Sequence, residues 1–365
     1  MTTASTASHG RLLRLGYVGC GFMAQKVHLP NLLTTPGCEV VALAELRQEL
    51  GRKVQERLRI PRLYSDHQAL LADPEIDAIC VSGGFMAQGD IARDALLAGK
   101  DVFMEKPMAI SLAQADRILA ASRQSGKRLM VGYMKRHDAG NEIAKAEIER
   151  LRGSGELGAV TYARSHDFAG DWTNGLDTPM DQSDEPMPRM PVVGPEWMPP
   201  QFVGQYLNYI NEYTHNVNLL RWLLGAGEDV AVRAVDLDDD GYTGIVVFDM
   251  AGVRATLETG DVSHYRYDDH TQIYFQHGWV RLAMPPLLLK QVPAEVEFYR
   301  AGEEQSFIRR VPQPAWSWSY KREVEQFVQC LRTGSPFRSS AEDTRTDVRL
   351  FEDIFRFHLA RRQVL

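Results

Sequence analysis

A strand-like apolar run near the start of the chain is followed by two closely spaced glycines, in the segment RLGYVGCGFMAQKVHLP. Gly19, Gly21 and Ala24 form a G-x-G-x-x-A pattern ahead of a predicted helix. In such a turn the first glycine permits a sharp bend, the second leaves room for a pyrophosphate, and the small third residue lets the helix pack on the sheet. The free N–H groups at the start of that helix, around Phe22 and Met23, would face the phosphates. The pattern predicts a dinucleotide-binding turn, with a bare strand-to-helix turn as the alternative.

An acidic residue, Glu45, follows the next predicted strand, CEVVALAE, at the distance of about 20 residues that a dinucleotide site requires. Its carboxylate can accept hydrogen bonds from the hydroxyls of the adenine ribose. The same charge repels a 2′-phosphate, which favours NAD over NADP. Arg47 could instead hold that phosphate, so NADP stays the less favoured cofactor. The alternative for Glu45 is an ordinary exposed carboxylate.

A lysine that precedes a proline ends a further predicted strand, in the segment KDVFMEKP. Loops at the carboxyl ends of parallel strands converge on the cofactor cleft, so Lys106 should point to where a substrate would lie. Pro107 biases the lysine toward an extended conformation and helps to fix its direction, through a cis bond if one is present. An ammonium there can donate to a substrate oxygen and, with a lowered pKa, relay the hydroxyl proton. The alternative is a surface lysine at a strand end.

A long segment, NYINEYTHNVNLLRWLLG, has apolar residues at helical spacing, which predicts a helix over Asn208–Leu224. Asn211 and His215 lie on its polar face, together with Asn218 and Trp222. A polar face that carries a histidine can border a cleft, although a lone histidine is more often structural.

These residues need elements that position them, and the first third of the chain alternates predicted strands and helices. Continuous apolar runs predict strands at LRLGYVG, CEVVALAE, IDAICVSG, KDVFMEK and KRLMVGY. The helical segments between them are Phe22–Leu33, Leu46–Leu58, Asp90–Ala98 and Leu112–Ser125. Buried strands separated by helices indicate a parallel sheet that is covered on both faces.

The pattern changes after about Tyr133. A helix over Gly140–Leu151 and a strand over Ala159–His166 precede a long irregular segment. Beyond the histidine helix, three strand pairs with tight turns follow: GIVVFDM with VRATLET, TQIYFQ with WVRLAM, and AEVEFYR with SFIRRV. Hairpins in series indicate a mainly antiparallel sheet. Helices around Tyr320–Leu331 and Asp343–Leu359 close the chain.

The composition is that of a globular protein with two ordinary domains, because the 365 residues are 44% hydrophobic and 24% charged. A net charge of −7 without a basic stripe argues against a nucleic-acid partner. The four cysteines form no CxxC pair, which indicates reduced thiols rather than a disulfide framework or a metal site. Residues 1–10 read as a frayed tail and not as a secretory signal, and no apolar stretch approaches the roughly 20 residues of a membrane span. We therefore expect a cytoplasmic protein without a membrane partner.

Four motifs together resemble the glucose–fructose oxidoreductase / inositol dehydrogenase (Gfo/Idh/MocA) family: VGCGFMA…H, AGKDVFMEKP, VGYMKR and YTHNVNLLRWLLG. The resemblance covers most of the chain and implies an α/β protein. Its N-terminal Rossmann domain would be followed by a C-terminal α/β domain on an open, mainly antiparallel sheet. We set these domains at residues 11–135 and 136–365, after the tail. In this family the lysine of the E-K-P motif sits beside the nicotinamide and the reacting carbinol, which implies a catalytic role for Lys106 and places Glu105 at the same site.

The histidine helix matches the family with one change. The family's D-x-x-x-H pattern falls on Asn211 and His215, so an asparagine stands where the family has an aspartate. Asparagine can bind sugar hydroxyls but cannot stabilise an imidazolium by charge. We therefore expect His215 to be less basic than in relatives, unless Glu212 helps. Lys106 remains the main proton-transfer candidate, and His215 is expected to bind or polarise the substrate oxygen.

Two further segments are implicated by the resemblance. The loop VSGGFMAQ lacks the family's usual Thr-Pro pair and histidine, and we expect it to be more flexible. Ser82, Gly83 and Gln88 in this loop are candidate cofactor contacts. Tyr133 and Arg136 in VGYMKRHD are candidates for the substrate pocket, with a structural role equally open.

The connection from Ala169 to Pro200 is rich in proline and carries Trp172 and Trp197. So long a segment without periodicity is usually functional or disordered. It could cover the substrate pocket, with one tryptophan stacked on a pyranose face, or form a subunit contact or a packed surface loop. The family often packs the sheet that follows face to face, which implies a homodimer or homotetramer.

The resemblance implies an NAD(P)-dependent oxidoreductase that transfers a hydride between nicotinamide and a secondary alcohol or ketone of a sugar, cyclitol or glycoside. An NAD-dependent glycosidase or lyase, acting by transient oxidation and elimination as in some relatives, is the first alternative. A non-catalytic NAD-binding protein, suggested by the missing aspartate, is the second.

Overall fold

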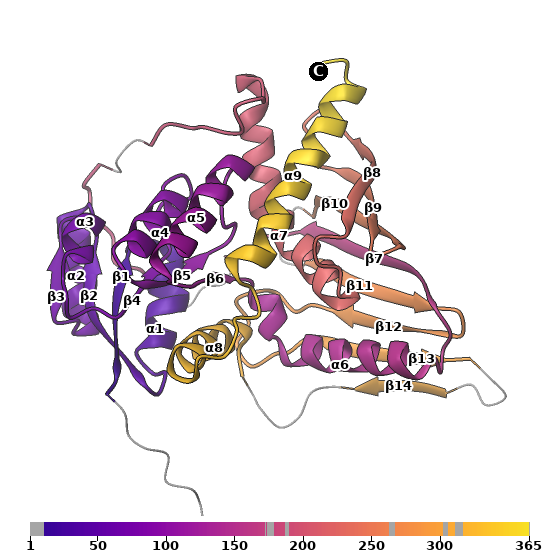
Figure 1. The fold of residues 1–365 in the computed structure, drawn as a ribbon, viewed down its shortest axis with the longest axis horizontal. Coiled ribbons are helices and arrows are strands. Elements are labelled where there is room, and N and C mark those ends of the chain that lie inside the picture. Colours follow the sequence, from indigo (N-terminus) through magenta and orange to yellow (C-terminus); the bar gives the residue numbers. More distant parts are fainter. Residues whose placement is uncertain are drawn as a thin grey trace, which may run out of the picture.

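The computed structural model describes residues 11–171, 173, 179–186, 190–262, 267–301, 306–310 and 317–364 (Figure 1). The predicted tail, residues 1–10, lies outside the described residues. Two sheets form the framework, and the histidine helix lies between them (Figure 1).

The first sheet has six strands, all paired in parallel, in the order β3-β2-β1-β4-β5-β6. This order is that of the doubly wound dinucleotide-binding fold, in which ligands bind at the carboxyl ends of the strands. The predicted parallel sheet is confirmed, with the short edge strand β3 as an addition that the sequence did not predict. The strands are β1 (Leu13–Val18), β2 (Cys38–Ala44), β3 (Arg62–Tyr64), β4 (Ala78–Val81), β5 (Asp101–Glu105) and β6 (Leu129–Gly132).

Helices cover both faces of this sheet, because its strands are apolar on both sides. On one face, buried residues of α4 and α5 pack against strand residues such as Val102 and Met104. On the other, α1, α2 and α8 pack against residues such as Tyr17 and Phe103. The predicted helix after the glycine turn begins as a π-helical turn, η1 (Ala24–His28). The other elements are α1 (Leu29–Leu32), α2 (Gln48–Leu58), α3 (His67–Leu71), α4 (Gln88–Leu97), α5 (Leu112–Ser125) and α8 (Ser319–Thr333).

The second sheet has eight strands in the order β14-β13-β12-β11-β7-β10-β9-β8. The pair β7–β10 is parallel and the other described pairs are antiparallel, so the predicted mainly antiparallel sheet is confirmed. The predicted hairpins are β9–β10, β11–β12 and β13–β14. The strands are β7 (Val160–Ala169), β8 (Val230–Leu237), β9 (Gly244–Met250), β10 (Val253–Asp261), β11 (Asp268–Phe275), β12 (Gly278–Ala283), β13 (Glu295–Arg300) and β14 (Ser306–Arg310).

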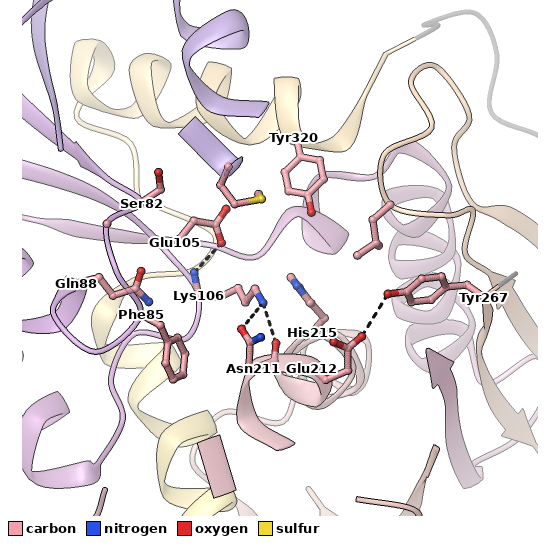
Figure 2. A pocket seen from close by; sticks show the side chains of 13 residues that line it. Ser82, Phe85, Gln88, Glu105, Lys106, Asn211, Glu212, His215, Tyr267 and Tyr320 are labelled. Atoms are coloured by element: carbon pink, nitrogen blue, oxygen red, sulfur yellow. Dashed lines mark hydrogen bonds between the residues drawn. The ribbon is translucent and has the colours of Figure 1, made fainter. Parts of the chain in front are cut away.

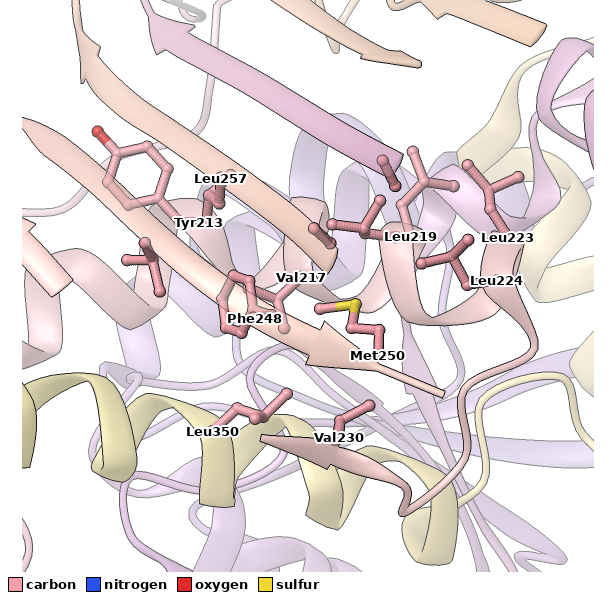
Figure 3. Close-up of a cluster of buried hydrophobic side chains, with 14 of the residues drawn as sticks. Tyr213, Val217, Leu219, Leu223, Leu224, Val230, Phe248, Met250, Leu257 and Leu350 are labelled. Carbon is pink, nitrogen blue, oxygen red and sulfur yellow. The ribbon is translucent and has the colours of Figure 1, made fainter. Parts of the chain in front are cut away.

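One face of the second sheet is covered by three helices, α6 (Ala139–Ser154), α7 (Val203–Leu224) and α9 (Ala341–Arg361). Figure 3 shows Val217 of α7 packed with Phe248 of β9 in this core. Two short 3₁₀ turns, η2 (Met134–His137) and η3 (Pro200–Phe202), lead into α6 and α7. No helix in the described part of the chain is both long and apolar enough to cross a membrane.

The last two helices of the chain, α8 and α9, pack against the first predicted domain although they follow the second sheet in the sequence. Val324 and Phe327 of α8 belong to the core of the first sheet, although α8 follows the second sheet in the chain. Helix α9 contacts both α5 of the first domain and β8 of the second. We propose that the boundary between the two domains lies near residue 135. Helix α8, near the C-terminal end of the chain, packs on the first domain.

Candidate active site

A groove of about 340 Å³ lies at the carboxyl ends of β1, β2 and β4, and the glycine turn forms part of its wall. Gly19, Gly21, Phe22 and Met23 all line it. Gly19 has a φ of +100°, and a Cβ there would lie 3.0 Å from the Cα of Gly83 in the loop after β4. A Cβ on Gly21 would meet no atom within 4 Å, so the space beside it belongs to the groove. The two glycines therefore serve different purposes: close approach of two turns, and room for a ligand.

Glu45 and Arg47, just after β2, line the same groove and are held together. Oε2 of Glu45 accepts a hydrogen bond from the N–H of Cys20 at 2.7 Å, and Oε1 accepts one from Nε of Arg47 at 3.0 Å. The buried carboxylate is thus fixed in direction by the glycine turn itself. Asp66 and His67, at the start of α3, also line the groove and were not predicted.

A second cavity, of about 180 Å³, adjoins the groove where the loops of the first sheet meet helix α7 (Figure 2). Met23, Ser82 and Gly83 line both spaces, so the groove and the cavity are continuous. The cavity is also lined by Phe85, Gln88, Glu105, Lys106, Asn211, Glu212, His215, Tyr267, Leu287 and Tyr320.

Hydrogen bonds on both sides of Lys106 hold its backbone. Glu105 is buried, and its Oε1 is 2.6 Å from Nε2 of His28 in η1. Its Oε2 accepts a hydrogen bond from the N–H of Lys106 at 3.0 Å. The Lys106–Pro107 peptide bond is cis. Gln88, predicted as a cofactor contact, donates its amide to the carbonyl of Pro107 at 2.9 Å and so anchors the loop that follows the lysine.

The side chain of Lys106 reaches across to helix α7. Its Nζ donates to the backbone carbonyl of Asn211 at 2.7 Å and to Oδ1 of the same residue at 3.1 Å (Figure 2). Removal from water lowers the pKa of Lys106, and the carboxylates of Glu105 and Glu212 oppose that shift. A lysine with a lowered pKa exchanges a proton more readily near neutral pH than a free lysine does.

His215, one helical turn after Asn211, points into the same space as Lys106 (Figure 2). Burial, followed by the positive charges of Lys106 and Lys135, lowers the pKa of His215 well below its usual value. The imidazole is therefore neutral at neutral pH. Burial is the largest cause of this shift, and Asn211 is not among its causes.

Tyr133 and Arg136, predicted as substrate contacts, do not line the cavity. Tyr133 is buried, its hydroxyl lies 2.8 Å from Oγ1 of Thr214, and its ring meets that of His215 edge-on with centroids 6.2 Å apart. Arg136 is also buried and pairs with Asp343 of α9 at 2.6 Å. We correct both assignments, because the chain turns inward after β6: Tyr133 supports the histidine, and Arg136 ties η2 to α9.

Several cavity residues were not predicted, and they differ in how visible they are in the sequence. Glu212 was considered only as a helper of His215, although it directly follows Asn211 in the same helix. Tyr267 precedes β11 and Tyr320 lies in the first turn of α8, far along the chain from the motifs. No local pattern marks these two tyrosines as site residues.

Of the two tryptophans in the long connection, Trp197 is described by the structure, and it does not line the cavity. Trp172 lies outside the described residues. Trp197 packs against α9 instead, where its Nε1 donates to Glu352 at 2.7 Å and its ring lies 4.0 Å from the guanidinium carbon of Arg356. Trp197 is therefore a packing residue in this structure.

Part of the connection, residues 179–186, crosses the first domain, and we call it the strap. The side-chain amide of Gln25 donates to the carbonyl of Asp181 at 3.1 Å and accepts from its N–H at 3.0 Å. The same amide donates to a carbonyl of the glycine turn at 2.9 Å. The carboxylate of Glu185 accepts hydrogen bonds from N–H groups in the first turn of α2. Met190, which lies beyond the strap in the same connection, lines the groove. The strap is thus attached to η1 and to the start of α2, the helices that follow the glycine turn and Glu45 in the chain.

Comparison with known proteins agrees with this architecture. Residues 13–133 match the model of an oxidoreductase family with an NAD-binding Rossmann fold, Gfo/Idh/MocA. Inositol 2-dehydrogenase from Pseudomonas fluorescens is 27% identical over 342 residues, which is 91% of this chain and 90% of that protein. Myo-inositol 2-dehydrogenase from Thermotoga maritima is 23% identical, with 91% of this chain and 92% of that protein covered.

Two solved structures share the fold over nearly the whole chain. Aldose-aldose oxidoreductase from Caulobacter crescentus, complexed with glycerol, superposes with a TM-score of 0.72 at 22% identity, covering 97% of this chain and 98% of that one. An oxidoreductase from Agrobacterium radiobacter, in complex with NAD⁺, L-tartaric acid and magnesium, gives a TM-score of 0.70 at 17% identity, covering 94% and 96%.

Proposed function

The chain belongs to the Gfo/Idh/MocA family of NAD-binding oxidoreductases, and on that basis we propose that it interconverts a secondary alcohol of a sugar or cyclitol and the corresponding ketone. The observation that carries this proposal is the continuity of the groove and the cavity, which share Met23, Ser82 and Gly83. A cofactor in the groove would present its reactive end to the cavity that contains Lys106 and His215. The relatives named inositol 2-dehydrogenase support a polyhydroxylated ring as the substrate.

The residues of the groove fit NAD. The open space beside Gly21 leaves room for the pyrophosphate, and Glu45 is oriented to accept hydrogen bonds from ribose hydroxyls. Arg47 is engaged by that carboxylate at 3.0 Å, and the negative charge of Glu45 disfavours a 2′-phosphate. We therefore propose NAD rather than NADP. When bound, NAD supplies the chemistry of hydride acceptance and return.

The cavity residues would handle the hydroxyl proton. The ammonium of Lys106 has three donors, of which two are used by Asn211, so one remains for a substrate oxygen. Its lowered pKa lets the neutral amine take the proton during oxidation and return it during reduction. The neutral imidazole of His215 can bind the same oxygen without adding a second positive charge beside the lysine.

The proposal is tested with purified protein, NAD and a panel of cyclitols, aldoses and glycosides. We expect stoichiometric formation of NADH, followed by its absorbance, with at least one neutral polyol. Product formation without net NADH would favour the elimination reaction instead. NAD binding without turnover across the panel would favour a non-catalytic role.

We also propose that two copies pack through the face of the second sheet that the helices leave open. Four aromatic side chains form one rung across that face, with Tyr162 opposite Tyr274, Tyr274 opposite Trp279, and Trp279 opposite Tyr299. All four are only half-buried in one copy of the chain. Light scattering should report an oligomer that Trp279→Glu dissociates; a wild-type monomer would contradict this.

A further inference from the structure

The cavity has a second polar side that the proposed proton transfer does not use. Glu212 follows Asn211 on α7, so its side chain is rotated by about 100° around the helix axis relative to that of Asn211. It therefore points away from Lys106, toward the opposite wall of the cavity. There the hydroxyl of Tyr267 donates to Oε1 of Glu212 at 3.4 Å (Figure 2). The carboxylate and the phenol thus form a pair that comes from α7 and from the loop before β11.

The carboxylate of Glu212 has spare capacity for hydrogen bonds. It forms no ion pair with a lysine, arginine or histidine among the described residues, and the long bond from Tyr267 is its one side-chain hydrogen bond there. A carboxylate offers about four acceptor positions, so most remain open to a ligand in the cavity. Burial first and then the negative charge of Glu212 raise the pKa of Tyr267, so the phenol stays protonated.

The charge of Glu212 acts on the cavity as a whole. Besides Tyr267, it opposes the burial-driven fall in the pKa of Lys106 and adds to the burial-driven rise in the pKa of Tyr320. Both residues line the cavity. A neutral hydroxyl is a donor that such a carboxylate can bind, whereas a substrate carboxylate would be repelled and would lose its own hydration.

We infer that Glu212 and Tyr267 form a specificity clamp for a hydroxyl group next to the reacting carbinol. This rests on the proposed function. The favoured substrates are neutral cyclic polyols with a vicinal diol: Lys106 and His215 bind the oxygen that is oxidised, and the clamp binds its neighbour. Substrates with a carboxylate at the neighbouring position, such as a uronic acid, are excluded by the same charge.

The test compares the wild-type protein with Glu212→Gln and Tyr267→Phe on three substrates. These are the best neutral polyol of the panel, its analogue deoxygenated next to the reacting carbon, and its carboxylate-bearing analogue. Glu56→Gln, on the exposed face of α2, is the matched control. Glu212→Gln keeps the shape of the side chain, and thermal unfolding with NAD binding verifies that each variant is folded.

We expect Glu212→Gln to lower kcat/KM for the polyol by about 10- to 100-fold, the range for a lost hydrogen bond to a charged group. The deoxy analogue should lose much less, and the carboxylate-bearing analogue should gain activity. The pH profile of kcat/KM should also move to lower pH, because Glu212 raises the pKa of Lys106. The other groups around that lysine, which are Glu105, Lys135 and His215, are unchanged in the variant.

Equal losses on the polyol and its deoxy analogue, or no loss on the polyol, would overturn the clamp. If the wild-type protein forms no NADH, the clamp can still be tested by calorimetry, which measures the affinity of the wild-type protein and of Glu212→Gln for the three compounds in the presence of NAD. If the wild-type protein binds the polyol without oxidising it and Glu212→Gln weakens this binding, the clamp is supported and the proposed oxidation is not. Absence of any polyol binding would overturn both.

Discussion

The cofactor groove and the adjoining cavity are built by different means. In the groove, the backbone around Gly19 and Gly21 supplies shape, and the oriented carboxylate of Glu45 supplies hydrogen bonds. In the cavity, titratable side chains face one another, and burial shifts the pKa of Lys106 and of His215. Variants of the groove should therefore change cofactor affinity, and variants of the cavity should change the chemistry. Substitutions in each of the two sites test this separation.

The largest expected effect is that of Lys106→Ala. Loss of the proposed general acid–base group should lower kcat by about 10²- to 10⁴-fold, and calorimetry should find NAD affinity unchanged. Lys127→Ala, at the other end of the first sheet, should behave like the wild type. A Lys106→Ala protein of near-normal rate would remove the lysine from the mechanism.

The two glycines of the turn should separate binding from stability. Gly21→Val places a side chain in open space, so it should abolish NAD binding while leaving the unfolding temperature nearly unchanged. Gly19→Ala should instead lower the free energy of unfolding by about 1–3 kcal/mol, because it forces a side chain into a left-handed conformation against Gly83. Unfolding curves and NAD titrations of both variants test this; a stable Gly19→Ala protein would contradict the close approach of the turns.

Cofactor choice should depend on Glu45. Glu45→Gln removes the charge that disfavours a 2′-phosphate and frees Arg47 from its ion pair. NAD affinity should fall by about 10- to 100-fold, and the ratio of the dissociation constants for NADP and NAD should fall with it. An unchanged ratio would mean that other residues select the cofactor.

A pH profile tests the cavity directly. We propose the neutral amine of Lys106 as the base in oxidation, and kcat/KM should then rise with pH through the pKa of this lysine. Because burial lowers that pKa, the midpoint should lie below the value of about 10.4 for a free lysine. A rise only at or above the ordinary value would argue that the lysine is solvated in the working enzyme.

The smallest effect is expected at the strap. Glu185 accepts hydrogen bonds from the N–H groups of Glu49 and Leu50 at 2.9 and 3.1 Å, so Glu185→Ala should lower the unfolding temperature slightly, as the loss of a helix cap does. NAD should also dissociate faster, with kcat for the bound complex unchanged. The neighbouring Asp184→Ala is the control. If Glu185→Ala and the wild-type protein release NAD at the same rate, the strap does not help to retain NAD in the groove.

Much of the groove could be predicted because its residues are close together in the sequence. Gly19, Gly21 and Glu45 belong to one strand–helix–strand unit, whose geometry is set by local backbone rules. The parallel sheet itself followed from continuous apolar strands, although the short β3 carries too weak a signal to be recognised. The cavity was predicted less completely. Tyr267 and Tyr320 come from segments without a motif, and their position depends on how the second sheet and α8 pack.

From the amino-acid sequence alone we predicted most strands and helices in their order, without β3, α3 and β8, together with the glycine turn and its carboxylate. The family resemblance implied that Lys106 and the histidine helix belong to one site. Three features became visible only in the folded chain: Tyr133 and Arg136 turn into the interior, Glu212 faces Tyr267, and the strap crosses the first domain. The physical reason is that local periodicity sets which face of an element is buried, whereas contacts between distant segments depend on packing that no single segment encodes.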